Sequence, residues 1–250
     1  MSDKEPLLDP KKKKLNEVSK EIYGSKTPSL APKLIVLLSI ALNVAVTSIL
    51  FFSEAFRNRF KRFKSNDFHL TALSRRIVLV TYGGVYFLRL SFSTMFFVKR
   101  KMKYQESFTI FVWLSIIFNS FCCFAVGNSY NNLLWLQLGL SIAFYLIGSI
   151  FNTGSELMRH FWKKKPENKG KLYTRGFNSI TRHPNYFGDV LLFSGWAIAA
   201  GWWTLYIPLL MFSFFVFFNI GVLENYLSEH YSEEWGDYKK RVKSLIPFVL

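Results

Sequence analysis

The chain has 250 residues, of which 50% are hydrophobic and 18% are aromatic, and its formal net charge is +16. Apolar runs of about 20 residues, the length that crosses a bilayer, alternate with basic segments. This pattern excludes an ordinary soluble domain and explains the charge through membrane topology and lipid headgroups rather than nucleic acid. We therefore expect an all-α, polytopic helical membrane protein with about six transmembrane helices.

The N-terminal segment 1–32 is polar and charged, and no apolar segment of a cleavable signal peptide precedes Leu34. We expect residues 1–32 to be a disordered polar tail and residues 33–250 to form a single multi-span membrane enzyme domain. Within the tail, Asp3–Leu8 resembles an acidic dileucine sorting signal.

Four apolar runs come first along the chain, each long enough for one span. Pro32 stands where the first helix should begin. A short polar turn over Asn128–Asn132 is predicted between the third run and the fourth. The four runs are Leu34–Phe52, Ile77–Val98, Phe108–Gly127 and Leu133–Asn152.

The fifth apolar stretch, Val190–Leu223, carries no charged residue over 34 positions, which is too long for one ordinary span. Gly201 and Pro208 lie near its middle. We expect two closely joined helices, over about 186–203 and 205–223. A single broken and steeply tilted helix is the alternative.

Basic loops predict the topology, because short loops rich in Lys and Arg face the cytosol. Segments 99–105, 154–185 and 224–250 fall on one side and are all basic, which predicts a cytosolic C-terminal face. Segment 54–76 is also basic, yet six spans would place it on the other side. Either it is an interfacial amphipathic piece or one early run does not cross fully.

Arg89 is the only ionised residue well inside a predicted span. Intramembrane charge is costly, so we expect Arg89 to snorkel, to pair with a neighbouring helix or to serve a site. Glu54 and Glu106, near the ends of apolar runs, are its candidate partners.

The densest polar segment is Met158–Asp189. Arg159 and Lys163 share one helix face, and Asn168–Lys171 is predicted to be a turn. Arg182 and His183 precede Pro184, where a helix should begin. A helix N-terminus flanked by cations suits a phosphate or a carboxylate. A merely basic loop that contacts lipid headgroups is the plainer interpretation.

A second polar cluster follows the last apolar run, where Glu224 lies at the helix exit. The aromatic stripe after it, which ends at Tyr238, suits interfacial anchoring or a cofactor wall. There is no GxGxxG, Walker A or HExxH motif. The adjacent Cys122 and Cys123 suit neither a disulfide nor a metal site, the four histidines are dispersed, and no metal site is expected.

The segment PENKGKLYTRGFNSITRHPNYFGD resembles the core motif of a superfamily of membrane enzymes. That superfamily comprises steroid 5-alpha-reductases, C14 sterol reductases and isoprenylcysteine carboxyl methyltransferases. The resemblance covers roughly residues 75–250 and is specific only in 159–189 and 224–248. LIPF at 245–248 and HPNYFGD are similar to the reductases, and the chain is most similar to a branch filed with the 5-alpha-reductases. Glu224 and the aromatic tail after it resemble the methyltransferases.

This resemblance implies NADPH as cofactor, held in the C-terminal half over about 154–250. Arg159 and Lys163 match the basic pair that binds the cofactor phosphate in sterol reductases, although here the order is Arg and then Lys. For the substrate end the resemblance offers only Tyr86, Tyr82 and Glu54 as catalytic candidates. The residues that the resemblance and the polar segments together nominate for the cofactor are Arg159, Lys163, Asn168, Lys171, Arg182, His183, Asn185, Tyr186, Asp189, Glu224 and Tyr238.

Three functions are consistent with these residues. The first is NADPH-dependent reduction of a carbon–carbon double bond in a sterol, steroid or other lipid, and the cations of 159–182 favour it because NADPH carries phosphates. The second is methyl transfer from S-adenosylmethionine to a lipid or prenylcysteine, and the third is non-catalytic lipid binding on the same fold. The expected partners are membrane lipids and a lipophilic small-molecule substrate, with no nucleic acid. The family suggests the endoplasmic reticulum.

Overall fold

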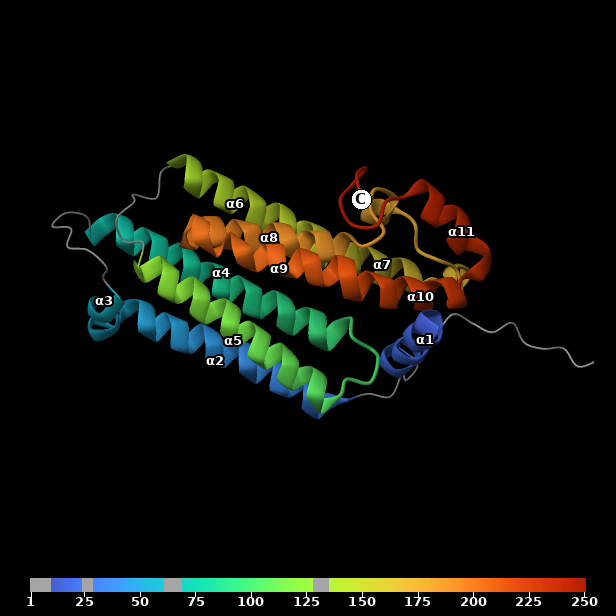
Figure 1. The fold of residues 1–250 in the computed structure, drawn as a ribbon, viewed down its shortest axis with the longest axis horizontal. Coiled ribbons are helices and arrows are strands. Elements are labelled where there is room, and N and C mark those ends of the chain that lie inside the picture. The colour runs from blue at the N-terminus through green and yellow to red at the C-terminus, as the bar shows by residue number, and fades with distance from the viewer. Residues whose placement is uncertain (1–9, 24–28, 61–68, 128–134) are drawn as a thin grey trace, which may run out of the picture.

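The computed structural model describes residues 10–23, 29–60, 69–127 and 135–250, and its regular elements there are all helical (Figure 1). The elements are α1 Pro10–Tyr23, α2 Leu30–Phe52, α3 Glu54–Phe60, α4 His69–Phe96, α5 Tyr104–Gly127, α6 Trp135–Ser149, the π-turn η1 Ile150–Gly154, α7 Ser155–Lys164, the short 3-10 turns η2 Pro166–Asn168 and η3 Gly176–Ser179, α8 Pro184–Ala200, the 3-10 turn η4 Trp202–Leu205, α9 Tyr206–Phe214, the π-turn η5 Phe215–Asn219, α10 Ile220–His230 and α11 Ser232–Arg241.

The expectation of a polytopic helical membrane protein is confirmed. Five helices are long and apolar enough to cross a membrane: Leu30–Phe52, Leu73–Phe96, Tyr104–Val126, Trp135–Lys164 and Trp202–His230. Helix α8 is apolar as well and has 17 residues. The long uncharged stretch forms two helices, as predicted, because the chain breaks at Gly201, whose φ of 142° is a conformation that favours glycine.

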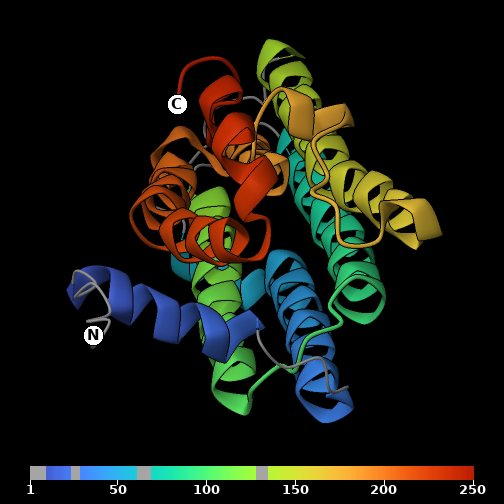
Figure 2. The same ribbon diagram turned by 90° about the vertical axis from the view of Figure 1, so that its right-hand side faces the viewer.

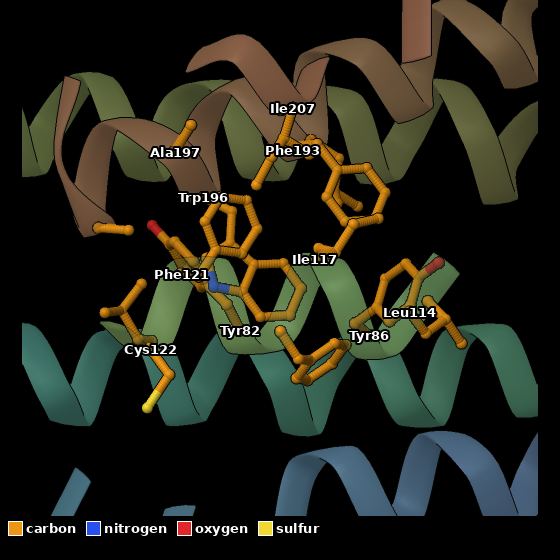
Figure 3. Close-up of a cluster of buried hydrophobic side chains, with 14 of the residues drawn as sticks. Tyr82, Tyr86, Leu114, Ile117, Phe121, Cys122, Phe193, Trp196, Ala197 and Ile207 are labelled. Carbon is orange, nitrogen blue, oxygen red and sulfur yellow. The ribbon is translucent and has the colours of Figure 1, made fainter. Parts of the chain in front are cut away.

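Helix α8 occupies the middle of the bundle, packed against α4, α5, α6 and α9 (Figures 1 and 2). It begins with Pro184 at its first turn, where the missing N–H of proline costs nothing. Its side chains Phe193 and Trp196 are buried against Tyr82 and Tyr86 of α4 (Figure 3). This aromatic core fixes the position of α8 relative to α4.

Glycines bring α6 and α8 into backbone contact. A methyl group added at Gly188 would meet the backbone nitrogen of Asn152 and would lie 2.6 Å from the Gly148 carbonyl oxygen. One added at Gly195 would lie 2.5 Å from the Tyr145 nitrogen. Small residues allow such close approach between membrane helices. The glycine of the HPNYFGD motif is therefore a packing residue.

The polar elements gather at one end of the bundle. In Figure 1, α1, α7, α11 and the connection between α4 and α5 lie at the right, whereas α3 lies at the left. Both α2 and α4 are longer than 20 residues, so the described start of segment 54–76 lies at the end opposite to the other basic segments. Which end faces the cytosol stays a prediction.

The N-terminal segment differs from the expected disordered tail, because residues 10–23 form helix α1, which packs against α10. Asn16 accepts a hydrogen bond from Asn225 Nδ2 over 2.5 Å, and Ser19 is fully buried. Asp3–Leu8 and the turn at Asn128–Asn132 lie outside the described residues.

Candidate active site

A cavity of about 610 Å³ opens between α4, α8 and α10, with η1 and α7 forming a further wall. Tyr86 lies at its inner part, about three turns before the end of α4. Arg100 and Lys99 lie at the outer part, on the connection between α4 and α5. The cavity therefore runs from the level of the apolar spans to the polar end of the bundle.

A polar chain crosses three helices at the inner part. Arg89 on α4 donates from Nη2 to Asn152 Oδ1 over 2.7 Å and from Nε to Thr153 Oγ1 over 2.8 Å. Asn152 in turn donates to Asp189 Oδ1 over 2.8 Å and to the Asn185 carbonyl oxygen over 3.1 Å. Arg89, Asn152, Asn185 and Asp189 all line the cavity. The charge of Arg89 is thus held inside the protein rather than against lipid.

Two local features of the sequence build this chain of hydrogen bonds. The π-turn η1 carries Asn152 and Thr153, and π-turns are frequent at functional sites. Gly188 allows α8 to touch the backbone of η1, which brings the next residue, Asp189, within reach of Asn152.

A second, smaller cavity of about 90 Å³ continues the first toward the polar end. Three cationic side chains line it: Arg159, Lys163 and Arg182. Arg159 is paired with Glu156 one turn earlier on α7. Lys163 donates to the Lys171 carbonyl oxygen and, over 2.9 Å, to the hydroxyl oxygen of Tyr231. The two cavities share Glu156, Arg159 and Asn185, so they form one cleft.

Glu224 joins the polar segments behind this cleft. Its carboxylate accepts from Arg182 Nη2 at 2.6 Å, lies 3.3 Å from His183 Nε2 and pairs with Lys239 at 3.1 Å. Arg182 also donates to the carbonyl oxygens of Lys239 and Val242. Glu224 therefore fastens the loop before α8 and the C-terminal segment to α10.

Burial sets the protonation of two groups near Glu224. Burial lowers the pKa of His183 below its ordinary value, and the hydrogen bond with Glu224 opposes this only in part. Burial likewise raises the pKa of Tyr238 to about 12, although its hydroxyl donates to the Asn178 carbonyl oxygen over 2.7 Å. Both groups are therefore neutral at physiological pH.

The structure separates the three catalytic candidates. Tyr86 lines the large cavity. Tyr82, one turn away, is buried in the core, stacked on Tyr145 with ring centroids 3.9 Å apart and hydrogen-bonded to Ser141 over 2.9 Å. Glu54 is exposed at the start of α3, at the opposite end of the bundle (Figure 1). Only Tyr86 of the three lies beside the cleft.

The partners expected for Arg89 were wrong, because its side chain bonds to Asn152 and Thr153. Glu106 pairs with Arg100 instead, over 2.8 Å, and Glu54 lies at the other end of the bundle. The two carboxylates belong to the ends of apolar runs, so neither reaches the depth of Arg89.

Apart from Glu224, which lies behind the cleft, the proposed cofactor residues fall into two groups. The cleft is lined by Arg159, Lys163, Arg182, His183, Asn185, Asp189 and Tyr238. Asn168 is buried and donates to the Trp162 carbonyl oxygen over 2.9 Å, which closes the end of α7. Lys171 offers its carbonyl oxygen to Lys163. Tyr186 stacks between His183 and Phe215, with centroid distances of 5.5 and 4.5 Å.

Sequence reasoning missed Asn152 and Glu156, which also line the cleft. Their spacing carried a signal, because Asn152, Glu156, Arg159 and Lys163 follow one another at steps of four, three and four residues. Such steps place polar side chains on one face of a helix.

Comparison with known proteins identifies the family. Residues 90–242 match the model described as "Protein of unknown function (DUF1295)". The chain belongs to the DUF1295 family. The matched region contains the rest of the polar chain but not Arg89, and it contains the cations Arg159, Lys163 and Arg182 of the smaller cavity.

Named relatives of this family member come from each branch of the expected superfamily, which is confirmed. Over 111 residues the chain is 31% identical to 3-oxo-5-alpha-steroid 4-dehydrogenase 1 of Rattus norvegicus, covering 43% of the chain and 40% of the relative. Over 151 residues it is 25% identical to Delta(14)-sterol reductase of Methylotuvimicrobium alcaliphilum, covering 52% and 34%. Over 103 residues it is 36% identical to Protein-S-isoprenylcysteine O-methyltransferase of Saccharomyces cerevisiae, covering 39% and 41%. The chain thus spans about two-fifths or less of the length of these relatives.

Proposed function

We propose that this protein is an NADPH-dependent reductase that reduces a carbon–carbon double bond in a membrane lipid, with sterols and steroids as the first substrates to test. The observation that carries this proposal is the chemical difference between the two ends of the cleft. One end is lined by cations near the polar surface, among them Arg159, Lys163 and Arg182, and the other end presents Tyr86 at the depth of the apolar spans. Such a cleft suits a phosphate-bearing cofactor that meets a lipid.

The cationic end fits the phosphates of NADPH. The guanidinium group of Arg159 offers several N–H donors, and Lys163 and Arg182 add two further positive charges. Most donors of Arg182 already bond to Glu224 and to the carbonyl oxygens of Lys239 and Val242, so Arg182 contributes mainly its charge. Glu156 holds Arg159 and the Tyr231 hydroxyl holds Lys163, so both cations are oriented before a ligand arrives. Preordered donors reduce the entropy lost on binding.

Bound NADPH would supply a hydride to the double bond. The residues of the chain would supply the remaining chemistry at the inner end. We assign Tyr86 as the group that polarises the substrate or gives it a proton, because it is the only phenol of the catalytic candidates that lines the cleft. Asn152 fixes the carboxylate of Asp189, and the aromatic side chains Phe193 and Trp196 exclude water behind Tyr86 (Figure 3).

A lipid substrate suits the walls of the cavity. Leu90 of α4 and Leu223 and Leu227 of α10 line it between the polar groups. The surrounding helices expose large hydrophobic side chains to the bilayer, so a lipophilic molecule can remain in apolar surroundings as it enters.

Methyl transfer from S-adenosylmethionine is the second candidate function, and two observations favour it. The relative in Saccharomyces cerevisiae named as a methyltransferase is 36% identical, whereas the rat and Methylotuvimicrobium reductases are 31% and 25% identical. Glu156 and Asp189 also place carboxylates in the cleft, where they could attract a sulfonium cation. The outer part still favours a ligand that carries phosphate, because Glu156 is its one carboxylate among the lining residues, against the cations Lys99, Arg100, Arg159, Lys163 and Arg182.

The test is calorimetric titration of NADPH and of S-adenosylmethionine into the detergent-purified full chain. We expect NADPH to bind and Arg159→Ala/Lys163→Ala to weaken it by roughly 100-fold, because two charge-assisted contacts of about 1.5 kcal/mol each are lost. Lys164→Ala/Lys165→Ala is the matched control, since both lysines are exposed neighbours outside the cleft. Binding of S-adenosylmethionine alone would replace the reductase with the methyltransferase, and binding of neither would favour a non-catalytic lipid-binding protein.

A further inference from the structure

A third cavity, of about 420 Å³, lies between the N-terminal helix α1 and the bundle. Its walls come from α1, from the connection between α4 and α5 with the start of α5, from Tyr186 of α8, and from Asn219 and Val222 at the start of α10. Figures 1 and 2 show α1 lying across this end of the bundle, beside α10. The cavity shares Arg100 with the large one, but none of the cations proposed to hold NADPH lines it.

The two sides of this cavity differ in chemistry. Val18 and Ile22 of α1 face it together with Val222 of α10, which makes one side aliphatic. The connection between α4 and α5 contributes three cations to the other side: Arg100, Lys101 and Lys103. A small soluble anion would leave the aliphatic side without a partner, and a wholly apolar molecule would leave the cations without one. The cavity therefore suits an amphipathic ligand.

The charges lining the cavity specify an anionic headgroup. Both carboxylates on its wall are already paired, Glu106 with Arg100 and Glu21 with Lys103. Lys101 is exposed, and no ion pair with a described residue is found for its ammonium group. No carboxylate is thus left for a ligand cation, whereas one lysine is left for a ligand anion. A phosphate group is the common lipid anion with this chemistry.

Helix α1 strengthens the same preference. Lys13, Lys14 and Lys20 are exposed on α1, against the exposed Glu17 and against Glu21, which is paired with Lys103, so the described surface of α1 has a net positive charge. A basic amphipathic helix beside a bilayer is attracted to anionic headgroups. The cavity also lies next to Tyr104, where α5 begins its apolar span, which is the level of the membrane surface.

We propose that the cavity under α1 binds the phosphate-bearing headgroup of an anionic phospholipid, with Lys101 at the phosphate and the aliphatic side of α1 against the lipid. The bound lipid stabilises α1 against α10. Because α10 carries Leu223 and Leu227 on its cleft side, this site lies one helix away from the proposed active site. The proposal holds for any reaction that the cleft performs.

Native mass spectrometry of the detergent-purified full chain tests this proposal with two lipids that differ only in headgroup. Dioleoyl phosphatidylglycerol should be retained roughly tenfold better than dioleoyl phosphatidylcholine. Lys101→Glu should remove this preference, whereas Lys165→Glu, the same change at an exposed lysine outside the cavity, should keep it. Equal retention of the two lipids by the unmodified chain, or an unchanged preference in Lys101→Glu, would overturn the proposal.

Two further measurements separate the lipid from free phosphate and from a folding defect. Millimolar inorganic phosphate should leave the bound phosphatidylglycerol in place, and its displacement would show a site for free phosphate instead of a lipid. In hydrogen exchange, phosphatidylglycerol should slow the exchange of backbone amides within Pro10–Tyr23 in the unmodified chain but not in Ile22→Asp. Equal slowing in both would also contradict the proposal.

Discussion

Asn152 donates a hydrogen bond to Asp189 Oδ1 over 2.8 Å, and this bond connects the end of the fourth apolar run to the HPNYFGD motif. The same amide accepts from Arg89 Nη2 over 2.7 Å, so one neutral side chain stands between a cation and an acidic side chain. Asn152 thereby gives both charged groups a hydrogen-bond partner at a depth where an unpaired charge would be costly. Three helices are held together by the residues that also line the cleft.

Replacing Asn152 should therefore destabilise the fold as well as the site. Asn152→Ala removes the partner of Arg89 Nη2 and of Asp189 Oδ1, and we expect a loss of about 2–4 kcal/mol in unfolding free energy. Thermal unfolding in detergent measures this loss. Asn119→Ala is the control, because Asn119 is exposed and its one side-chain hydrogen bond to a described residue goes to the Ser115 carbonyl oxygen one turn earlier. Equal stability of the two variants would contradict the role given to Asn152.

The glycine contacts between α6 and α8 predict opposite effects for two similar substitutions. Gly188→Ala places a methyl group against backbone atoms of Asn152 and Gly148, and we expect a loss of roughly 1–3 kcal/mol. Gly84→Ala, in the middle of α4 with nothing within 4 Å of the added methyl group, should be neutral or stabilising by up to about 1 kcal/mol. Melting temperatures of the two variants would decide, and a harmless Gly188→Ala would show that the helices can separate freely.

Tyr82 and Tyr86, one turn apart on α4, test the proposal that Tyr86 acts on the substrate at the inner end of the cleft. Tyr86→Phe should lower turnover about 100-fold or more on any lipid that the protein reduces, while the dissociation constant for NADPH changes little. Tyr82→Phe loses the hydrogen bond to Ser141 and should lower stability by about 1 kcal/mol instead, with turnover largely kept. Stopped-flow oxidation of NADPH separates the two effects. If Tyr82→Phe lost more turnover than Tyr86→Phe, Tyr82 rather than Tyr86 would be the catalytic tyrosine.

The buried imidazole of His183 predicts acid sensitivity. Because its pKa in the folded chain lies below the ordinary value of about 6.5, the unfolded chain binds a proton that the folded chain does not. The unfolded state is therefore favoured in acid. This loss of folding stability is absent well above that pH, where the imidazole is neutral in both states, and it grows as the pH falls below about 6.5. The melting temperature of the unmodified chain and of the exposed-site control His230→Gln should fall together, and that of His183→Gln should fall less. If the melting temperatures of all three proteins fell in parallel with pH, the His183 imidazole would not be a source of the acid sensitivity.

Much of the architecture followed from simple patterns. Hydropathy predicted the spans, and Gly201 with Pro208 predicted that the long uncharged stretch divides in two. The turn around Gly170 was also predicted, and its φ of 81° explains the glycine. These features depend on residues close together in the sequence, which is why the sequence alone could reveal them.

The residues missed or misplaced depend on contacts between distant segments. Tyr82 and Tyr86 share a helix face, so spacing could not tell which one opens into the cavity. Glu54 was chosen without knowing at which end of the bundle α3 lies. Asn152, in the π-turn η1, was overlooked because it ends an apolar run and its partners Arg89 and Asp189 lie far from it in the sequence.

That π-turn determines which segment could be transplanted as a working unit. An α-helix rotates by about 100° per residue, so the one additional residue that a π-turn accommodates turns everything after it by about that angle. Glu156, Arg159 and Lys163 face the cleft only with this offset after α6. A chimera that joined Ser155 onward to an unbroken helix would rotate its cations away from the cleft. The portable unit therefore begins at Ile150, five residues before the first residue of α7.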